Sequence, residues 1–392
     1  MSAEPAAVPP AEPMAPVETM APVEFARRGG VAEIILNRPR AINALTHEMV
    51  TAIGAALHSW ADDDTVRTVL LTGRGDRGLC AGGDVVGLYY DVRDGDGSAS
   101  AAFWAEEYEL NAYIARYPKP FVALMDGVTL GGGVGLAGHA AIRVVTERSK
   151  VGMPETAIGF VPDVGGTWLL SHAPGELGTY LGLTALPAGP ADAILTGFAD
   201  HFVPSERLGE LVEALAAAGD AAAMVARPER SETAQVAETE IAGVAAAGAA
   251  PKPGDASAVV ARFAESPPPG RLAADRSWID AAFSAPTVAE IVVRLRGDAA
   301  NSRALETAEL LERLSPTAVS VTLEALRRAA RLPSLEAALA QELVVSVHAL
   351  SSHDFMEGIR AQVIDKDRTP HWQPVALDDV DPADVAAYFG NE

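Results

Sequence analysis

Two carboxylates lie eight residues apart in an otherwise apolar segment, Met153-Pro-Glu155-Thr-Ala-Ile-Gly-Phe-Val-Pro-Asp163-Val-Gly-Gly166. A carboxylate in apolar surroundings is costly without a partner, and burial raises its pKa toward the range used in general acid and base catalysis. Either acid could instead cap a turn or a helix, and Asp163 precedes Val-Gly-Gly as an N-cap would. The position of both acids between glycine-flanked turns favours a catalytic role.

Two glycine-containing loops each follow an expected strand. Cys80-Ala-Gly-Gly-Asp84 comes after residues 68–73, and Gly131-Gly-Gly-Val-Gly135 comes after residues 121–127. Glycine lets backbone N–H groups turn inward and lets a ligand approach closely. Two such loops at neighbouring strand ends could direct two N–H donors at one developing oxyanion. The alternative is that both loops are only tight turns and close-packed helix starts.

A second alternative comes from Gly133-Val-Gly135-Leu-Ala-Gly138, which matches the GxGxxG pattern of dinucleotide-binding folds. That pattern requires a strand running into the first glycine and a long helix after it. The next apolar run already begins at Ala141, so no full helix fits. Glu155 stands at a suitable distance for the ribose-binding acid but follows a proline on a turn. Dinucleotide binding is therefore the weaker interpretation.

Other catalytic residue types lack the spacing that their chemistry needs. The eight histidines include no HExxH or similar pair, so we expect no metal, and no GxSxG segment marks a serine hydrolase. His139 and His172 are expected to be structural. Cys80 is the single cysteine and has no base near it in sequence, so we expect a structural thiol. One cysteine also excludes a disulfide framework and favours a reducing cytoplasm.

The elements expected to position these residues alternate between strands and helices. The expected strands are 31–36, 68–71, 121–124 and 141–145, and the expected helices are 47–60, with Thr46 as N-cap, and 100–115. This alternation over residues 25–205 indicates an α/β core with a buried sheet.

The two ends of the chain differ from this core. Residues 1–22 are rich in Pro and Ala and lack targeting features, so we expect a disordered tail before a core at 23–205. Residues 206–392 are expected to be mostly helical. Their Ala-rich part, 206–274, is interpreted as surface helices joined by loops. Later helices are expected to begin at Ser315-Pro316 and to span 335–350.

The overall charge limits the possible partners. The 392 residues carry a formal net charge of −23, which makes nucleic acids and anionic membranes poor partners. No apolar run approaches the roughly 18 residues of a membrane-spanning helix. An acidic protein that binds a polyanion must concentrate positive charge locally.

Taken together, these segments resemble the crotonase (enoyl-CoA hydratase/isomerase) superfamily. The resemblance is carried by Ile42-Asn-Ala-Leu45, Cys80-Ala-Gly-Gly-Asp84, Gly131-Gly-Gly133, Met153-Pro-Glu-Thr156 and Val164-Gly-Gly-Thr167. It implies an α/β fold with a crotonase-like ββα superhelical core, a C-terminal helical region and possible homo-oligomers. It also implies an acyl-CoA substrate, with coenzyme A as part of that substrate and no separate cofactor. The thioester oxygen would lie between the N–H groups of Gly83 and Gly132.

The chain also departs from the hydratase pattern. Hydratases carry one catalytic glutamate a few residues after the Gly-Gly-Gly turn and a second after the following proline. The second is present as Glu155, but Gly135 occupies the first position, and Asp163 stands where hydratases usually carry glycine. This exchange resembles the 3-hydroxyisobutyryl-CoA hydrolase subfamily, as do Glu106-Glu-Tyr108 and the stretch from Asp354 to Trp372.

The subfamily resemblance implies a hydrolase for 3-hydroxyisobutyryl-CoA or a similar short 3-hydroxyacyl-CoA, of the kind used in valine degradation. Glu155 would attack the carbonyl or activate water, and Asp163 would protonate, orient or bind the 3-hydroxyl. The expected substrate-binding residues are Glu107, Arg38, Arg40, Ala81 and Asp84, and the expected acyl-pocket residues are Trp104, Tyr108 and Phe160. A hydratase/isomerase and a non-catalytic acyl-CoA-binding protein remain the alternatives.

Overall fold

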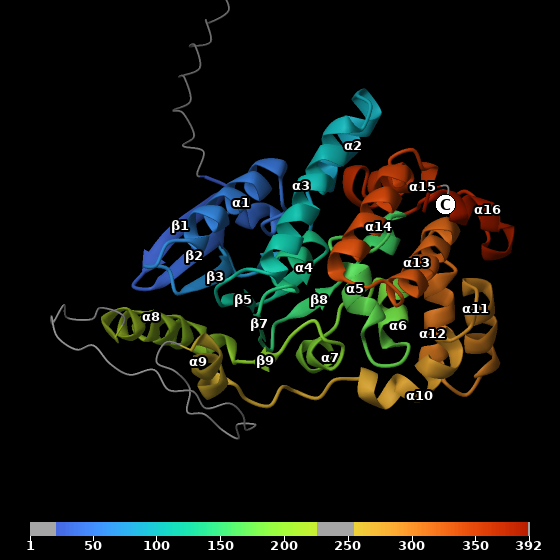
Figure 1. Cartoon of the computed structure of the whole chain (residues 1–392). Coiled ribbons are helices and arrows are strands. Elements are labelled where there is room, and N and C mark those ends of the chain that lie inside the picture. Colours follow the sequence, from blue (N-terminus) through green and yellow to red (C-terminus); the bar gives the residue numbers. More distant parts are fainter. Residues whose placement is uncertain (1–20, 226–254, 391–392) are drawn as a thin grey trace, which may run out of the picture.

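The structure is a computed structural model that describes residues 21–225 and 255–390, and the described strands form two sheets (Figure 1). The larger sheet has the order β1-β2-β3-β5-β7-β9, in which only the β1–β2 pair is antiparallel. The smaller sheet has the order β4-β6-β8 and is parallel. The strands are β1 (Val23–Arg28), β2 (Val31–Leu36), β3 (Thr68–Gly73), β4 (Gly78–Cys80), β5 (Phe121–Met125), β6 (Val128–Leu130), β7 (Ile142–Val145), β8 (Lys150–Gly152) and β9 (His201–Phe202).

The chain alternates between the two sheets. The pairs β3–β4, β5–β6 and β7–β8 each contribute one strand to the larger sheet and the next to the smaller. All four expected strands are confirmed as β2, β3, β5 and β7. Because β2 and β5 are buried along their whole length, their sequences are almost continuous apolar runs. The three-residue strands of the smaller sheet were not predicted, since so short a segment has no readable periodicity.

Sixteen helices are described, together with short 3-10 and π turns. They are α1 (His47–Ala61), α2 (Val85–Asp94), α3 (Ser98–Ala115), α4 (Gly132–Ala137), α5 (Gly166–Ser171), α6 (Leu177–Thr184), α7 (Pro190–Leu195), α8 (Leu208–Val225), α9 (Ala256–Phe263), α10 (Leu272–Phe283), α11 (Val288–Gly297), α12 (Ser302–Leu311), α13 (Pro316–Ala329), α14 (Leu335–Ala349), α15 (His353–Ile359) and α16 (Pro382–Ala387). The turns are η1 (Pro39–Ala41), η2 (Glu155–Ile158), η3 (Ser205–Arg207), η4 (Arg360–Ile364) and η5 (Leu377–Asp379). The predicted N-cap Thr46 is confirmed, since it accepts from the Met49 N–H. The helix start predicted at Ser315-Pro316 is confirmed as well, and Ser315 caps α13 by accepting from the Ala318 N–H.

Helices cover both faces of the larger sheet (Figure 1). On one face, α1 and α3 contribute buried side chains to the larger of the two hydrophobic cores. On the other face, α8 and α9 bury Leu211, Leu215 and Val260 against Leu70 and Val122. Part of the Ala-rich segment, residues 226–254, lies outside the described residues. The described part of α8 contributes to the core as well as to the surface.

The C-terminal helices α10–α16 form a second cluster beside the sheets (Figure 1). In this cluster α14 packs against α3, α13 packs against α5 and α6, and α15 packs against η2, the turn that begins at Glu155. The C-terminal helical region therefore reaches the segment that carries the predicted acids. No helix in the described ranges is long and apolar enough to cross a membrane.

Candidate active site

A cavity of about 280 Å³ brings the two glycine loops and the predicted acids together. It lies between α2, α3, the start of α4, η2 and α15. The lining residues are Ala81, Gly82, Gly83, Val85, Leu88, Phe103, Trp104, Glu107, Gly131, Gly132, Pro154, Glu155, Ala157, Ile158, Phe160, Asp163, Phe355, Gln362 and Val363. Residues from five separate segments of the sequence thus line one cavity.

The first glycine loop is held by the Ile42–Leu45 segment. The Ala81 N–H donates to the Ile42 carbonyl, the Leu45 N–H donates to Gly82, and the Asp84 N–H donates to Leu45. None of the hydrogen bonds found among the described residues uses the N–H of Gly83, the residue between Gly82 and Asp84. The bonds on either side of Gly83 hold the loop in place. Because its own N–H has no partner in the described part of the chain, that group is available to a ligand.

The second glycine loop follows β6, which pairs in parallel with β4. Gly131 has a φ of +51°, a conformation that L side chains rarely adopt. Gly132 is the first residue of α4, and N–H groups in a first helical turn have no acceptor within the helix. A Cβ placed on Gly132 would lie 3.4 Å from the Gly83 nitrogen. The two predicted oxyanion-hole residues are therefore neighbours, as the sequence predicted.

Two of the acids lie directly against this loop. A Cβ on Gly131 would meet Glu155 Oε1 at 2.7 Å, and a Cβ on Gly132 would meet Glu107 Oε1 at 2.6 Å. Glu155 Oε2 and Glu107 Oε1 are buried, with no hydrogen-bond partner among the described residues. A buried carboxyl oxygen without a partner is costly in a folded protein. These two oxygens are consequently good candidates for contact with a substrate.

Asp163 is the third acid and is 6% exposed. Tyr108, on α3, donates a hydrogen bond of 2.8 Å to Asp163 Oδ2. The Asp163 side chain does not cap the following helix, because the N-cap of α5 is Gly165 and makes no side-chain cap bond. The structure therefore does not support the alternative that Asp163 is a capping residue.

Burial raises the pKa of all three carboxyls. For Glu155 and for Glu107 the second cause is the nearby charge of Asp163. For Asp163 burial raises the pKa to about 7, and the Tyr108 hydrogen bond opposes the rise. Because these acids interact, they titrate as a group. A cluster of this kind can hold and release protons near neutral pH.

Aromatic rings form the apolar wall of the cavity. Trp104 stacks on Phe160 with ring centroids 5.3 Å apart, and Phe160 lies 5.0 Å from Phe355. Trp104 and Phe160 were predicted as pocket residues, but Phe355, Gln362 and Val363 were not. These three come from the C-terminal region, which the sequence marked only through the subfamily resemblance of the stretch from Asp354 to Trp372.

The packing around Gly135 accounts for the absence of the first glutamate that hydratases carry at this position. A Cβ on Gly135 would lie 2.7 Å from the Val164 Cβ and 2.9 Å from the Asn111 amide nitrogen. Asn111 is fully buried, and both its side-chain polar atoms lack a protein partner among the described residues. The space around Gly135 is therefore filled by Val164 and Asn111.

The dinucleotide interpretation is wrong for this chain. The GxGxxG glycines lie in and just after the six-residue helix α4, not in a loop before a long helix. A Cβ on Gly133 would collide with Cys80, and one on Gly138 would collide with the Val134 carbonyl and the Leu169 side chain. These glycines allow close packing rather than the approach of a pyrophosphate.

The remaining predicted binding residues lie around the first glycine loop. Ala81 lines the cavity, whereas Arg38 forms an ion pair with Asp84 at 2.8 Å outside the lining. Arg40 is exposed on η1. Tyr108 contacts Asp163 but does not line this cavity.

The cysteine and the two histidines have local roles. The Cys80 thiol is fully buried and donates to the Asn43 carbonyl, and burial raises its pKa to about 12, which keeps it neutral. His139 Nε2 lies 2.8 Å from the Val164 carbonyl, and His172 Nδ1 lies 2.8 Å from the Trp168 carbonyl. These contacts agree with the structural roles expected for all three. Within the described ranges, no three His, Cys, Asp or Glu residues are grouped as metal ligands would be.

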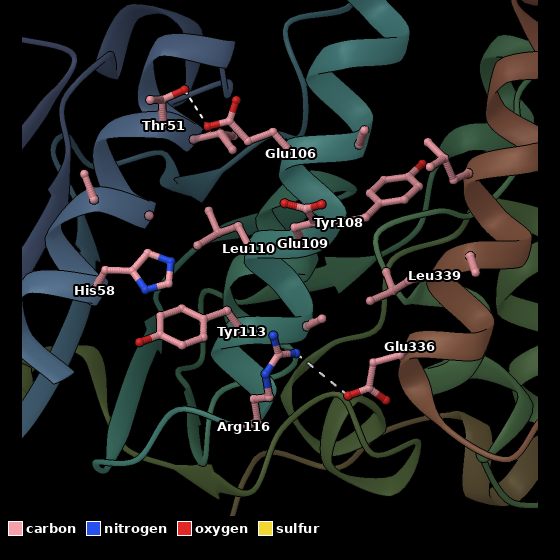
Figure 2. Close-up of a pocket in the computed structure, with 17 residues that line it drawn as sticks. Thr51, His58, Glu106, Tyr108, Glu109, Leu110, Tyr113, Arg116, Glu336 and Leu339 are labelled. Carbon is pink, nitrogen blue, oxygen red and sulfur yellow. Dashed lines mark hydrogen bonds and ion pairs between the residues drawn. The ribbon is translucent and has the colours of Figure 1, made fainter.

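A larger groove of about 810 Å³ lies on the other side of α3, between α1 and α14 (Figure 2). Its polar contacts include the Thr51–Glu106 hydrogen bond and the Arg116–Glu336 ion pair. It contains neither glycine loop and none of the three clustered acids. We therefore assign the candidate active site to the smaller cavity.

The fold and this site define a crotonase-type enzyme. A family model described as enoyl-CoA hydratase/isomerase matches residues 31–389. The chain belongs to the enoyl-CoA hydratase/isomerase (crotonase) family and is an acyl-CoA enzyme of that family.

Several named relatives are similar over most of the chain. The mitochondrial 3-hydroxyisobutyryl-CoA hydrolases of Rattus norvegicus and Homo sapiens are 38% and 35% identical, and each match covers 93% of this chain and 87% of the relative. Among solved structures, a carnitinyl-CoA dehydratase from Mycobacterium thermoresistibile is 46% identical with a TM-score of 0.82, covering 95% of this chain and 97% of that one. An enoyl-CoA hydratase from Rhodobacter sphaeroides is 39% identical with a TM-score of 0.80, covering 94% and 97%.

Proposed function

We propose that this chain is a thioester hydrolase that acts on 3-hydroxyisobutyryl-CoA or a similar short 3-hydroxyacyl-CoA. The observation that carries the proposal is which positions around the proposed oxyanion hole hold a carboxyl group and which do not. Glu155 and Asp163 are both buried at the cavity, whereas position 135 has no carboxylate and no space for one. Hydration by two cooperating glutamates needs an acid at that position. Relatives named as 3-hydroxyisobutyryl-CoA hydrolases support the same assignment.

In the proposed reaction the thioester oxygen accepts hydrogen bonds from the Gly83 and Gly132 N–H groups. Glu155 either removes a proton from the attacking water or attacks the carbonyl itself to form an anhydride that water then hydrolyses. The carbon–sulfur bond breaks, and the coenzyme A thiolate leaves readily because a thiol has a pKa near roughly 8.5. Asp163 supplies the proton that the leaving sulfur takes up.

The shape of the cavity supports a short polar acyl group. Stacked rings of Trp104 and Phe160 provide an apolar wall, and a volume of about 280 Å³ leaves little room for a long chain. Glu107 Oε1 is buried and unpartnered among the described residues, beside Gly132. This oxygen can accept a hydrogen bond from a 3-hydroxyl group of the substrate.

Hydration or dehydration is the second candidate. It is favoured by the solved carnitinyl-CoA dehydratase and enoyl-CoA hydratase, which are 46% and 39% identical to this chain. Glu155 could serve as the single acid–base group in such a reaction. The two candidates differ in their product, since only hydrolysis releases a free thiol.

The direct test is a free-thiol release assay on 3-hydroxyisobutyryl-CoA beside a hydration assay on crotonyl-CoA. We expect thiol release from the hydroxyacyl substrate, little hydration, and loss of thiol release in both Glu155→Gln and Asp163→Asn. Thiol release that persists in both variants would refute the mechanism. Quenching with hydroxylamine distinguishes the two roles of Glu155, because only an anhydride leaves a hydroxamate on that residue.

The cellular location and the oligomeric state of the enzyme are also proposals. We propose a cytoplasmic enzyme, since the single cysteine is buried and reduced. Cell fractionation tests the location. We also propose a homo-oligomer, and light scattering of the purified chain tests it.

A further inference from the structure

Glu342 is a buried carboxylate that the proposed reaction does not use. It lies on α14, in the C-terminal region, and is 1% exposed. It accepts hydrogen bonds from the Gly165 N–H at 2.6 Å, the Thr167 N–H at 2.9 Å and the Thr167 hydroxyl at 2.5 Å. Burial raises its pKa to about 8, while these three donors oppose the rise. A carboxylate with three donors is firmly held in place.

The backbone that Glu342 contacts directly follows Asp163 and is strained. Val164 has a φ of +52°, an outlier for a β-branched residue, and Gly165 has a φ of +78°. Such a conformation persists only where the surroundings hold it. His139 donates to the Val164 carbonyl, and Glu342 accepts from the next N–H along the chain. The turn is thus held from two sides.

The same helix reaches Asp163 by a second route. Ser346 lies one turn after Glu342, and its Oγ is 2.8 Å from the Tyr108 hydroxyl, which donates to Asp163. Figure 2 shows the Tyr108 side chain pointing from α3 toward α14. One face of α14 therefore contacts both the backbone after Asp163 and the hydrogen-bond donor of its carboxyl.

We propose that Glu342 is a positioning residue, which holds the strained 163–167 turn so that the Asp163 carboxyl stays against Tyr108 and faces the cavity. This inference rests on the proposed function, in which Asp163 supplies a proton. It assigns to the C-terminal helical region a part in catalysis beyond lining the pocket. The competing explanation is that Glu342 only stabilises the start of α5.

The variant Glu342→Gln separates these explanations. The amide keeps the size of the side chain but replaces one accepting oxygen with an NH₂ group, which must then face a backbone N–H. The chain offers a matched control in Asp192, which is also buried and accepts from two backbone N–H groups at the start of α10, Arg271 and Leu272, each at 3.0 Å. Asp192 lines a different cavity.

We expect Glu342→Gln to lower kcat for thiol release by about tenfold to a hundredfold, with KM changed by less than about threefold, because a misplaced catalytic group slows the chemical step. Asp192→Asn should lower Tm but leave kcat and KM unchanged. A Glu342→Gln variant that behaves like Asp192→Asn would overturn the proposal. If Glu342→Gln does not fold, Thr167→Val removes one of the three donors and should cause a smaller loss of kcat.

A double-mutant cycle gives the sharper test. In an Asp163→Asn background, Glu342→Gln should reduce the residual thiol release by less than about twofold, because the group that it positions has been removed. A full additional loss would mean that Glu342 acts independently and would overturn the proposal.

A crystal structure of Glu342→Gln adds a measurement that does not depend on turnover. We expect the 2.8 Å Tyr108–Asp163 contact to be broken, and an intact contact would overturn the inference. If the wild-type protein releases no thiol, the proposed function fails, while this structural test still decides whether Glu342 positions Asp163.

Discussion

The Tyr108 hydroxyl donates to Asp163 Oδ2 at 2.8 Å and lies equally close to Ser346 Oγ. The first two residues are 55 positions apart in the chain, and Ser346 lies a further 183 positions beyond Asp163. All three are buried. One phenol group thus connects the α/β core, the proposed catalytic acid and the C-terminal helical region.

Removing this hydroxyl should change the pH dependence of hydrolysis. The Tyr108 hydrogen bond favours the charged form of Asp163 and holds its pKa down, whereas burial raises it to about 7. Tyr108→Phe should therefore raise the pKa further. If Asp163 acts as an acid, the alkaline fall of kcat/KM should move upward by about half to one pH unit. An alkaline limb at its wild-type position in Tyr108→Phe would contradict this role.

Displacing the Gly132 N–H from the proposed oxyanion hole should abolish most of the activity. In Gly132→Ala the new Cβ would lie 2.6 Å from Glu107 Oε1 and 3.1 Å from the Leu45 side chain. The resulting shift of the Gly132 N–H should lower kcat by about a hundredfold to a thousandfold, as loss of one oxyanion donor does. Gly54→Ala is the control, because a Cβ there meets nothing within 4 Å. It should keep wild-type kinetics and gain about 0.5–1 kcal/mol of stability.

Restoring a glutamate at position 135 should not create a hydratase. The Val164 side chain and the Asn111 amide occupy the space that the new side chain needs. We expect Gly135→Glu to be destabilised by at least about 3 kcal/mol, since it combines overpacking with a buried charge. Chemical denaturation measures the loss, and a crotonyl-CoA assay on any folded fraction should show no gain in hydration. A stable, hydrating variant would show that the packing is not the obstacle.

The buried Asp163 carboxyl should reduce the stability of the folded protein above neutral pH. The folded-state pKa of Asp163 is raised from 3.8 to about 7. Its neutral form is therefore favoured in the folded protein, and the associated stability is present below pH 3.8 and is lost as the pH rises through about 7. Asp163→Asn should raise Tm by a few degrees relative to wild type at pH 8.5. At pH 5 the gain should be smaller, and an equal gain at both values would contradict the shifted pKa.

Binding of the nucleotide part of the CoA thioester should depend on Arg40. This residue is exposed on η1, near the first glycine loop, and Arg is suited to phosphate. Arg40→Ala should raise KM for the CoA thioester by about threefold to tenfold. The corresponding pantetheine thioester lacks the nucleotide, so its KM should not change. An equal rise for both substrates would rule out contact with the CoA phosphates.

The sequence predicted the larger sheet better than the smaller one. Buried parallel strands such as β2 and β5 are long enough for their apolar runs to be recognised. In contrast, β4, β6 and β8 have three residues each, and only the repeated alternation of the chain between two sheets makes them strands. The glycine loops follow these short strands, so the sequence located the loops without identifying what supports them.

The residue types at the candidate site could be recognised from the sequence alone. Glycine at 83 and 132, acids at 107, 155 and 163, and the missing acid at 135 are local facts, because close backbone approach and proton transfer each require a specific side chain. Only the tertiary structure decided which of them meet, what raises the pKa of each acid, that Phe355 lines the cavity, and that Glu342 holds the backbone after Asp163. Burial, charge proximity and packing across hundreds of residues arise from the folded arrangement, and no local pattern in the sequence encodes them.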